Sequence, residues 1–289
     1  MAESDEPKRV KVGLALGGGG SRGYAHLGVA KALRELGIPI CCVAGTSIGS
    51  IVGGVLASDM LMRALNWAHE PDWFKLPKLF LKWHMPWRSL LGSERIEAFL
   101  RDMVCAKTFD ELVMPFAAVA TDLLTGDEVV MRSGDLQSAM RASMAIPGIF
   151  DPIERDGRIL VDGGLVDPVP ADVCRSLGAE AVIAVDINSV KIIPEPGRLQ
   201  LQQLNMLDII DQTFTVVCNG VGKGVLEKNP PDFLLKPSVG SVKMMDFRDA
   251  DRLIEIGYAC AMEHKEELVN LSWGRGAVKN FHPQIGDAS

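Results

Sequence analysis

The sequence predicts an α/β fold of three layers, in which a mostly parallel central sheet lies between two layers of helices. Short apolar runs typical of buried strands alternate with longer segments of helical periodicity, and this alternation builds parallel sheets. Glycine-rich turns join the first two strands to the helices that follow them. The chain has 289 residues, 47% of them hydrophobic, which is enough to bury one large core.

The first third of the chain carries the alternation most clearly. The apolar run from Val10 to Leu16 predicts a strand, and Leu27, Ala30 and Leu33 mark one face of the helix after it. Up to residue 104 we expect strands at 10–16 and 39–44, helices at 24–36, 48–58 and 93–104, and an irregular stretch at about 66–92.

Turn and capping residues divide the remainder. Met114-Pro115 opens a strand, Gly126-Asp127 makes the turn to the next strand, and Asp135 caps a helix that Pro147-Gly148 ends. We expect strands at 114–120, 128–132, 159–161, 181–185 and 233–235, and helices at 135–144, 171–177, about 199–228 and 249–270.

Composition limits the class of protein. The net charge of −7 leaves no basic footprint for nucleic acid. The charged N-terminus lacks the apolar core of a secretory signal, and no apolar run is long enough to span a membrane. Six scattered cysteines without a C-x-x-C pair are expected to be buried free thiols in a reducing cytosol. These features predict a cytoplasmic location.

We expect one catalytic domain at 10–273, with a cap-like insertion at about 60–92. A disordered N-terminus at 1–9 and a loose C-terminal tail at 274–289 flank it.

The pentapeptide Gly45-Thr46-Ser47-Ile48-Gly49 is a G-x-S-x-G motif between a predicted strand and a predicted helix. This is the context in which the motif forms a nucleophile elbow, because the glycines allow a strained turn and leave room beside the serine. Ser47 is therefore the candidate nucleophile, exposed at a strand end near the positive end of a helix.

A glycine run, Gly17 to Gly23, follows the first strand. Its backbone N–H groups would form a cradle for an anion, either a phosphate or the oxyanion of an acyl-transfer intermediate, and Arg22 adds a fixed charge. The run also satisfies the dinucleotide pattern G-x-G-x-x-G, but the second strand ends at Gly45 without the acid that holds a ribose. We therefore predict no nucleotide; a purely structural glycine turn stays open as an alternative.

A third motif ends the strand before residue 162. Asp162 is followed by Gly163 and Gly164, which clear side-chain bulk and let the carboxylate approach another loop. Asp162 is a plausible base for Ser47. Asp122, Asp167 and Asp186 are interpreted as turn or capping residues.

These three motifs, in order and at strand ends, resemble the patatin-like phospholipase family, and most closely its bacterial members and the catalytic domain of neuropathy target esterase. The segment Arg141–Phe150 is also similar, and the resemblance runs from about Val10 to Asp186. It implies a patatin-like fold and three groups of site residues. These are the oxyanion loop Gly18, Gly19, Gly20, Ser21, Arg22 and Gly23; the elbow Gly45, Thr46, Ser47, Ile48 and Gly49; and the dyad acid Asp162 with Gly163 and Gly164.

The five histidines supply no evident third member of a triad. None follows Asp162 at a strand end, and His264 lies in a charged helix that suggests a solvated face. His26, one turn into the helix after the glycine loop, is expected to orient that loop, with a role as base the less favoured alternative. A Ser47–Asp162 dyad is the economical prediction, and the resemblance implies it too. No cluster has the spacing of metal ligands, so no metal and no cofactor are predicted.

The segment Trp73–Gly92 is basic and aromatic in an otherwise acidic chain. It has four basic residues, three tryptophans and no acid. This composition is typical of a lipid-facing element, and also compatible with a cap packed over the site. The lipid-facing candidates are Trp73, Lys75, Lys78, Lys82, Trp83, Trp87 and Arg88.

We therefore expect a serine lipid acyl hydrolase acting on phospholipids or lysophospholipids, with peripheral membrane contact. The alternatives are an esterase or thioesterase for a soluble acyl substrate and a non-catalytic, membrane-docking regulatory protein. No nucleic-acid or nucleotide partner is expected, and no oligomeric state is predicted.

Overall fold

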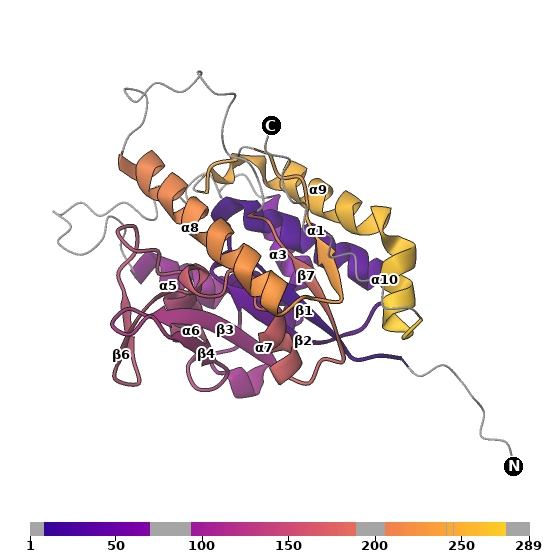
Figure 1. The fold of residues 1–289 in the computed structure, drawn as a ribbon, viewed down its shortest axis with the longest axis horizontal. Coiled ribbons are helices and arrows are strands. Elements are labelled where there is room, and N and C mark those ends of the chain that lie inside the picture. Colours follow the sequence, from indigo (N-terminus) through magenta and orange to yellow (C-terminus); the bar gives the residue numbers. More distant parts are fainter. Residues whose placement is uncertain (1–8, 70–93, 189–205, 241, 245, 276–289) are drawn as a thin grey trace, which may run out of the picture.

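A computed structural model describes residues 9–69, 94–188, 206–240, 242–244 and 246–275. The fold is the predicted one, a mixed and mostly parallel sheet flanked by helices (Figure 1). In the described residues the sheet has eight strands, in the order β5-β6-β3-β2-β1-β7-β8 with β4 paired to β3. The strands are β1 (Val12–Leu16), β2 (Ile40–Thr46), β3 (Phe116–Asp122), β4 (Glu128–Met131), β5 (Ile153–Arg155), β6 (Arg158–Asp162), β7 (Ala181–Val185) and β8 (Phe233–Leu235).

Helices return the chain from β1 to β2, from β2 to β3 and from β7 to β8, so these strands run parallel. β2 pairs in parallel with β1 and β3, and β7 pairs in parallel with β1 and β8. β4 and β6 pair with β3 in the antiparallel sense, as β5 does with β6. The described helices are α1 (Tyr24–Glu35), α2 (Ile48–Ala57), α3 (Leu61–Ala68), α5 (Glu94–Met103), α6 (Leu136–Ser143), α7 (Ala171–Ser176), α8 (Met206–Lys228), α9 (Ala250–Glu263) and α10 (Lys265–Ser272).

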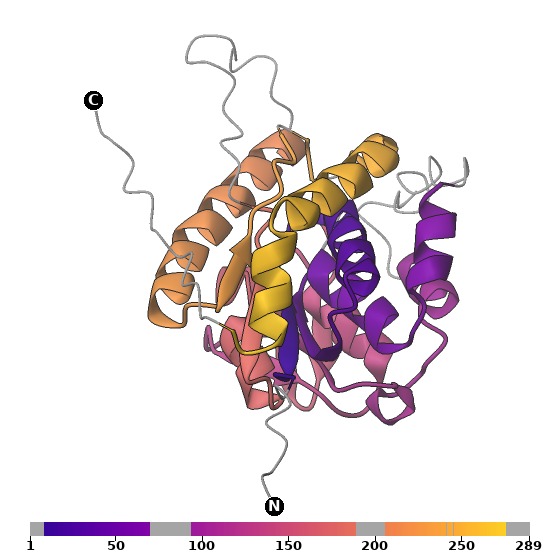
Figure 2. The ribbon, with the colours of Figure 1, turned by 90° about the vertical axis from the view of Figure 1, so that its right-hand side faces the viewer.

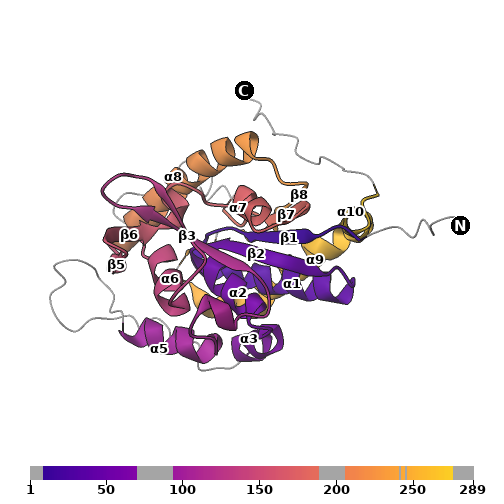
Figure 3. The same ribbon diagram turned by 90° about the horizontal axis from the view of Figure 1, so that it is seen from below.

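Alternate residues of the buried strands face two separate cores. Leu14, Leu16 and Val43 point into the larger core, beneath the layer that contains α1, α2, α3 and α9. Ala15 and Ala44 point the other way, into a smaller core closed by α7 and part of α8. Figure 3 shows α7 and α8 on one side of the sheet and α1, α2 and α3 on the other, and Figure 2 gives the same separation from the side.

The packing of α1 on α9 requires glycine. A Cβ on Gly28 would lie 1.9 Å from Ile254 O, and one on Gly257 would lie 1.9 Å from Ala25 O, so any side chain would force the two backbones apart. The described ends of the chain also meet, since Val10 N donates to Ser272 O at 3.0 Å.

Four expectations need correction. Part of the stretch at 66–92 is not irregular, because α3 continues to Ala68 and buries Leu61 and Leu65 in the core. The helix at 249–270 is two helices, which separate at His264 with φ −106° and ψ 23°. The strand β5 was not expected. All six cysteines are free thiols, but Cys105 is exposed, and Cys41 and Cys260 are only partly buried.

The predictions for the termini concern residues that lie mainly outside the described ones, and Trp73–Gly92 lies wholly outside them. The role of Trp73–Gly92 as a lipid-docking element remains a prediction.

Candidate active site

The sheet register brings Ser47 and Asp162 to either side of one strand. Thr46, the last residue of β2, pairs with Val119 of β3, and the neighbouring Ala120 pairs with Asp162 at the end of β6. Because adjacent strands lie about 5 Å apart, the two side chains converge across β3 although 115 positions separate them in the sequence (162 − 47).

Ser47 has the backbone geometry of an elbow. Its φ of 56° and ψ of −124° lie in a region that non-glycine residues rarely occupy, and such a residue costs about 1–3 kcal/mol. The turn around it is tight, because a Cβ on Gly45 would lie 2.2 Å from Gly49 O and one on Gly49 would lie 2.1 Å from Leu16 O. The two glycines of the motif are therefore required by close backbone approach.

Three hydrogen bonds hold the elbow. Ser47 N donates to Ser143 Oγ at 2.9 Å, and Ser143 Oγ donates to Val119 O at 2.6 Å. Ser50 Oγ donates to Ser47 O at 2.6 Å. Sequence reasoning gave Ser143 no role of its own, although it lies in the segment Arg141–Phe150 that carries part of the resemblance.

Asp162 is fully buried and fixed by its surroundings. Asp162 Oδ1 accepts from Gly164 N at 2.8 Å, and the main chain is held by Thr121 Oγ1, which donates to Asp162 O at 2.8 Å. Burial raises the pKa of Asp162 from 3.8 to about 7, while hydrogen bonds from Ser47 and from Gly164 lower it. The carboxyl group can therefore take up a proton near neutral pH.

Gly163 explains how the acid reaches this place. A Cβ on Gly163 would lie 2.3 Å from Val119 O, so only glycine lets the chain after Asp162 pass against β3. We expected Gly163 and Gly164 to remove side-chain bulk so that Asp162 could approach another segment closely, and Gly163 does this against β3.

The glycine loop has fewer free donors than expected. Gly18 N donates to Pro168 O at 3.0 Å and Ser21 N donates to Met244 O at 2.7 Å. Among the described residues, the N–H groups of Gly19, Gly20 and Ile48 have no hydrogen-bond partner. The Gly18 N–H expected as an oxyanion donor is thus engaged elsewhere, and Ile48, the first residue of α2, offers a donor that sequence reasoning did not name.

Gly18 nevertheless lies beside Ser47, since a Cβ placed on it would be 3.3 Å from Ser47 Cβ. The loop and the elbow are therefore adjacent.

Arg22 holds the loop from within. Its side chain is fully buried, and its Nε donates to Gly19 O at 3.0 Å. Gly19 O and Gly20 N belong to one planar trans peptide and point in opposite directions. Arg22 therefore fixes the direction of the Gly20 N–H. Of the two roles considered for Arg22, holding the loop or binding a phosphate, the structure has the first.

His26 also contacts this loop. Its Nε2 donates to Gly17 O at 2.8 Å, and burial lowers the pKa of His26 to about 4, so the ring is neutral at pH 7. The expectation that His26 orients the loop is confirmed. His264 is far more solvated, with 36% of its side chain exposed, and pairs with Glu267 at 3.7 Å.

The acids interpreted as turn residues behave as predicted. Asp122, Asp167 and Asp186 accept hydrogen bonds from the N–H two residues later, in Leu124, Val169 and Asn188, at 3.0, 3.3 and 2.9 Å. In the described parts of the chain, no group of three or more His, Cys, Asp or Glu side chains is placed to hold a metal ion. A search of the same residues finds no helix that combines the length and apolarity needed to cross a membrane.

Comparison with known proteins gives a consistent family. Residues 14–175 match the model of the patatin-like phospholipase family. An uncharacterised NTE family protein of Mycobacterium tuberculosis is 43% identical over 64% of this chain and 51% of its own length. Patatin-like phospholipase domain-containing proteins of Caenorhabditis elegans and Homo sapiens are 33% and 30% identical over 89% and 92% of this chain.

The chain spans about half the length of the mycobacterial relatives and about a fifth of the animal ones. Among solved structures, VipD from Legionella pneumophila aligns with a TM-score of 0.48 and 13% identity, over 90% of this chain and 67% of that one. Because the family model matches more than half of the chain, including the elbow and Asp162, the chain belongs to the patatin-like phospholipase family.

Proposed function

We propose that this chain is a serine lipid acyl hydrolase that cleaves acyl esters of phospholipids or lysophospholipids through a Ser47–Asp162 dyad. The observation that carries the proposal is the pairing of a serine in a strained elbow with a fully buried carboxyl group whose pKa is raised to about 7. Asp162 Oδ2 has no hydrogen-bond partner among the described residues, so it is available to the Ser47 hydroxyl.

The dyad performs acyl transfer in two halves. Asp162 takes the proton of Ser47 Oγ as that oxygen attacks the acyl carbonyl carbon, which gives a tetrahedral oxyanion. The N–H groups of Gly19, Gly20 and Ile48 stabilise this charge, aided by the positive end of α2. The intermediate collapses, the alcohol leaves with the proton from Asp162, and the acyl-enzyme remains.

The second half regenerates Ser47. Asp162 takes a proton from water, the resulting hydroxide attacks the acyl carbonyl, and Ser47 leaves with that proton as the fatty acid is released. A carboxylate is a weak base for a hydroxyl group when it is hydrated. The burial of Asp162 supports its role because it brings the basicity of the carboxylate close to the operating pH.

A fluorophosphonate probe followed by lipid profiling tests the proposal. The wild-type protein should be labelled at Ser47 and should release fatty acid from phosphatidylcholine or lysophosphatidylcholine. Labelling with hydrolysis of soluble esters alone would favour the esterase or thioesterase alternative. An unlabelled protein that still binds vesicles would favour a regulatory role and would refute the dyad.

A further inference from the structure

An apolar cavity of about 90 Å³ lies next to the elbow. Gly23 of the glycine loop and Ile48, the residue after Ser47, line its near end. The walls come from α1, α2, α3 and α5, four helices of the larger core. A cavity of this kind, lined by hydrophobic side chains, stays dry and takes up apolar molecules.

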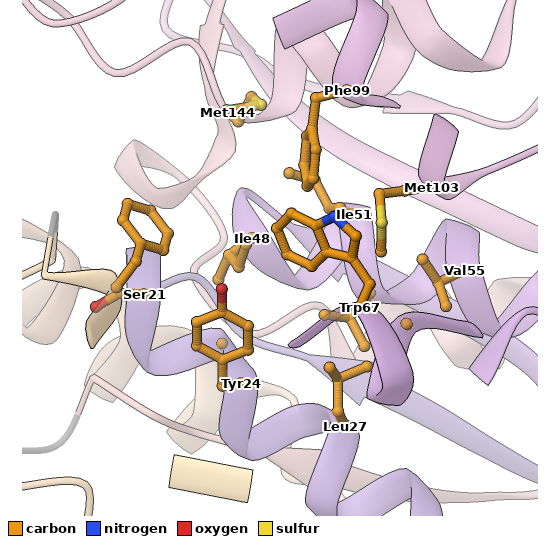
Figure 4. A pocket seen from close by; sticks show the side chains of 14 residues that line it. Ser21, Tyr24, Leu27, Ile48, Ile51, Val55, Trp67, Phe99, Met103 and Met144 are labelled. Atoms are coloured by element: carbon orange, nitrogen blue, oxygen red, sulfur yellow. The ribbon is translucent and has the colours of Figure 1, made fainter. Parts of the chain in front are cut away.

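The cavity follows one face of α2 away from Ser47. Ile48, Ile51 and Val55 line it, at the i, i+3 and i+7 spacing of a single helix face. Figure 4 shows these three side chains in a row along the helix. Seven residues of helix rise about 10 Å, so the lining extends about that far from the nucleophile.

Two aromatic side chains line the cavity from α3 and α5. Trp67 of α3 and Phe99 of α5 pack with ring centroids 5.0 Å apart and an interplanar angle of 49°. Figure 4 shows the Trp67 indole across the cavity from Tyr24, with Phe99 and Met103 beside it. Val55 is the last residue of the row along α2, and Trp67 has the largest side chain in the lining; we call these two residues the far end.

The chemistry of the lining selects hydrocarbon. Ser21 and Tyr24 are its two polar residues, and no charged side chain lines it among the described residues. Ser21 Oγ donates to Lys243 O at 3.0 Å, so its hydroxyl is already engaged. Burial raises the pKa of Tyr24, which keeps the phenol neutral. A charged or strongly polar ligand would lose hydration without gaining a partner.

We propose that this cavity binds the acyl chain of the substrate next to its carbonyl group, and that Val55 and Trp67 set the chain length at which binding stops improving. The inference rests on the proposed function. An extended octanoyl chain, with carbon–carbon bonds of about 1.5 Å in a zigzag, matches the length of the lining. Carbons beyond this point lie outside the cavity and add little.

This predicts a specific length profile for monomeric p-nitrophenyl esters. From butyrate to octanoate, kcat/KM should rise up to about fourfold for each added methylene, the factor that corresponds to about 0.8 kcal/mol. From octanoate to laurate it should rise no further.

Two substitutions at the far end should move the profile in opposite directions. Val55→Phe fills space for about two methylene groups, so the octanoate-to-butyrate ratio should fall by roughly tenfold. Trp67→Phe removes part of the wall, so laurate should become a better substrate than octanoate. Val113→Phe, a matched exchange at a side chain that is 68% exposed, should leave the ratios of wild type unchanged.

Calorimetric binding of 1-octanol separates the cavity from the chemistry. Wild type should bind 1-octanol, and Val55→Phe should bind it more weakly. If wild type hydrolyses no ester yet shows this binding pattern, the proposed function fails while the cavity assignment stands. If wild type hydrolyses esters but both far-end variants keep its ratios and its octanol affinity, the cavity assignment is overturned. Should Val55→Phe fail to fold, the laurate-to-octanoate ratio of Trp67→Phe decides.

Discussion

Replacing Asp162 by asparagine should abolish most activity and stabilise the fold at alkaline pH. Burial raises the pKa of Asp162 from 3.8 to about 7, so folding disfavours the charged form. The stabilising contribution of the neutral carboxyl group is fully present below pH 3.8 and is lost as pH rises through about 7. Asparagine keeps the shape and the acceptor for Gly164 N but never ionises.

The magnitude follows from the two pKa values. Each pH unit between 3.8 and about 7 lowers the free energy of unfolding of the wild type by about 1.4 kcal/mol. The buried Asp162 carboxyl group therefore costs at most about 4 kcal/mol of stability at pH 8. At pH 5 the Asp162 carboxyl group is still protonated in the folded wild type, and the corresponding loss of stability is less than about 2 kcal/mol. Asp162→Asn should therefore unfold at a higher temperature than wild type, by a margin at least about twice as large at pH 8 as at pH 5.

Thermal unfolding of ligand-free protein at the two pH values measures this margin, with the exposed Asp110→Asn as the matched control. In parallel, kcat should fall by about 10²–10⁴ in Asp162→Asn, the usual contribution of a general base. Wild-type kcat/KM should drop about tenfold for each pH unit below about 7. A margin equal at pH 5 and pH 8, together with wild-type activity that is flat across this range, would refute a buried carboxylate base.

Three further outcomes test the rest of the site. Ser47→Ala should lose all fluorophosphonate labelling while remaining folded by circular dichroism; labelling equal to wild type would place the nucleophile elsewhere. Arg22→Lys keeps the charge but loses the Nε donor to Gly19 O, so kcat should fall by up to about 10²-fold with little change in KM, and a change confined to KM would contradict this role. Lys75, Lys78 and Lys82 changed together to glutamate should weaken flotation with phosphatidylserine vesicles but spare hydrolysis of p-nitrophenyl butyrate, because each basic residue near an anionic leaflet contributes about 1 kcal/mol. The matched triple change at the exposed Lys223, Lys228 and Lys236 should keep vesicle binding, and full binding by the first triple mutant would refute docking through Trp73–Gly92.

Local patterns were sufficient to predict the frame of the site. The strands that carry Ser47 and Asp162 are short apolar runs ended by glycine motifs, and both the order and the period of such runs are visible in one dimension. Helix ends were predictable where a capping residue marks them, as at Asp135, whose Oδ1 accepts from Ser138 N at 2.6 Å. His264 carries no comparable signal, and the break between α9 and α10 was missed there.

The contacts that tune the site depend on packing between distant segments. Gly18 N meets Pro168 O and Ser47 N meets Ser143 Oγ across 150 and 96 positions (168 − 18 and 143 − 47). No spacing rule links such positions, because the register of β3 against β2 and β6 decides which groups meet. The raised pKa of Asp162 was unpredictable for the same reason, since it depends on complete burial.

Three features that each lower the stability of the fold lie close together around Ser47. Ser47 has a positive φ, Asp162 is a buried carboxyl group, and Arg22 is a buried guanidinium whose Nη1 and Nη2 make no hydrogen bond among the described residues. Each of them alone lowers the stability of a fold, because strain and desolvated charge are unfavourable. A core optimised for stability alone would carry none of them. Their concentration around one serine is what we expect if the surrounding sheet and helices hold the arrangement for the proposed chemistry at Ser47.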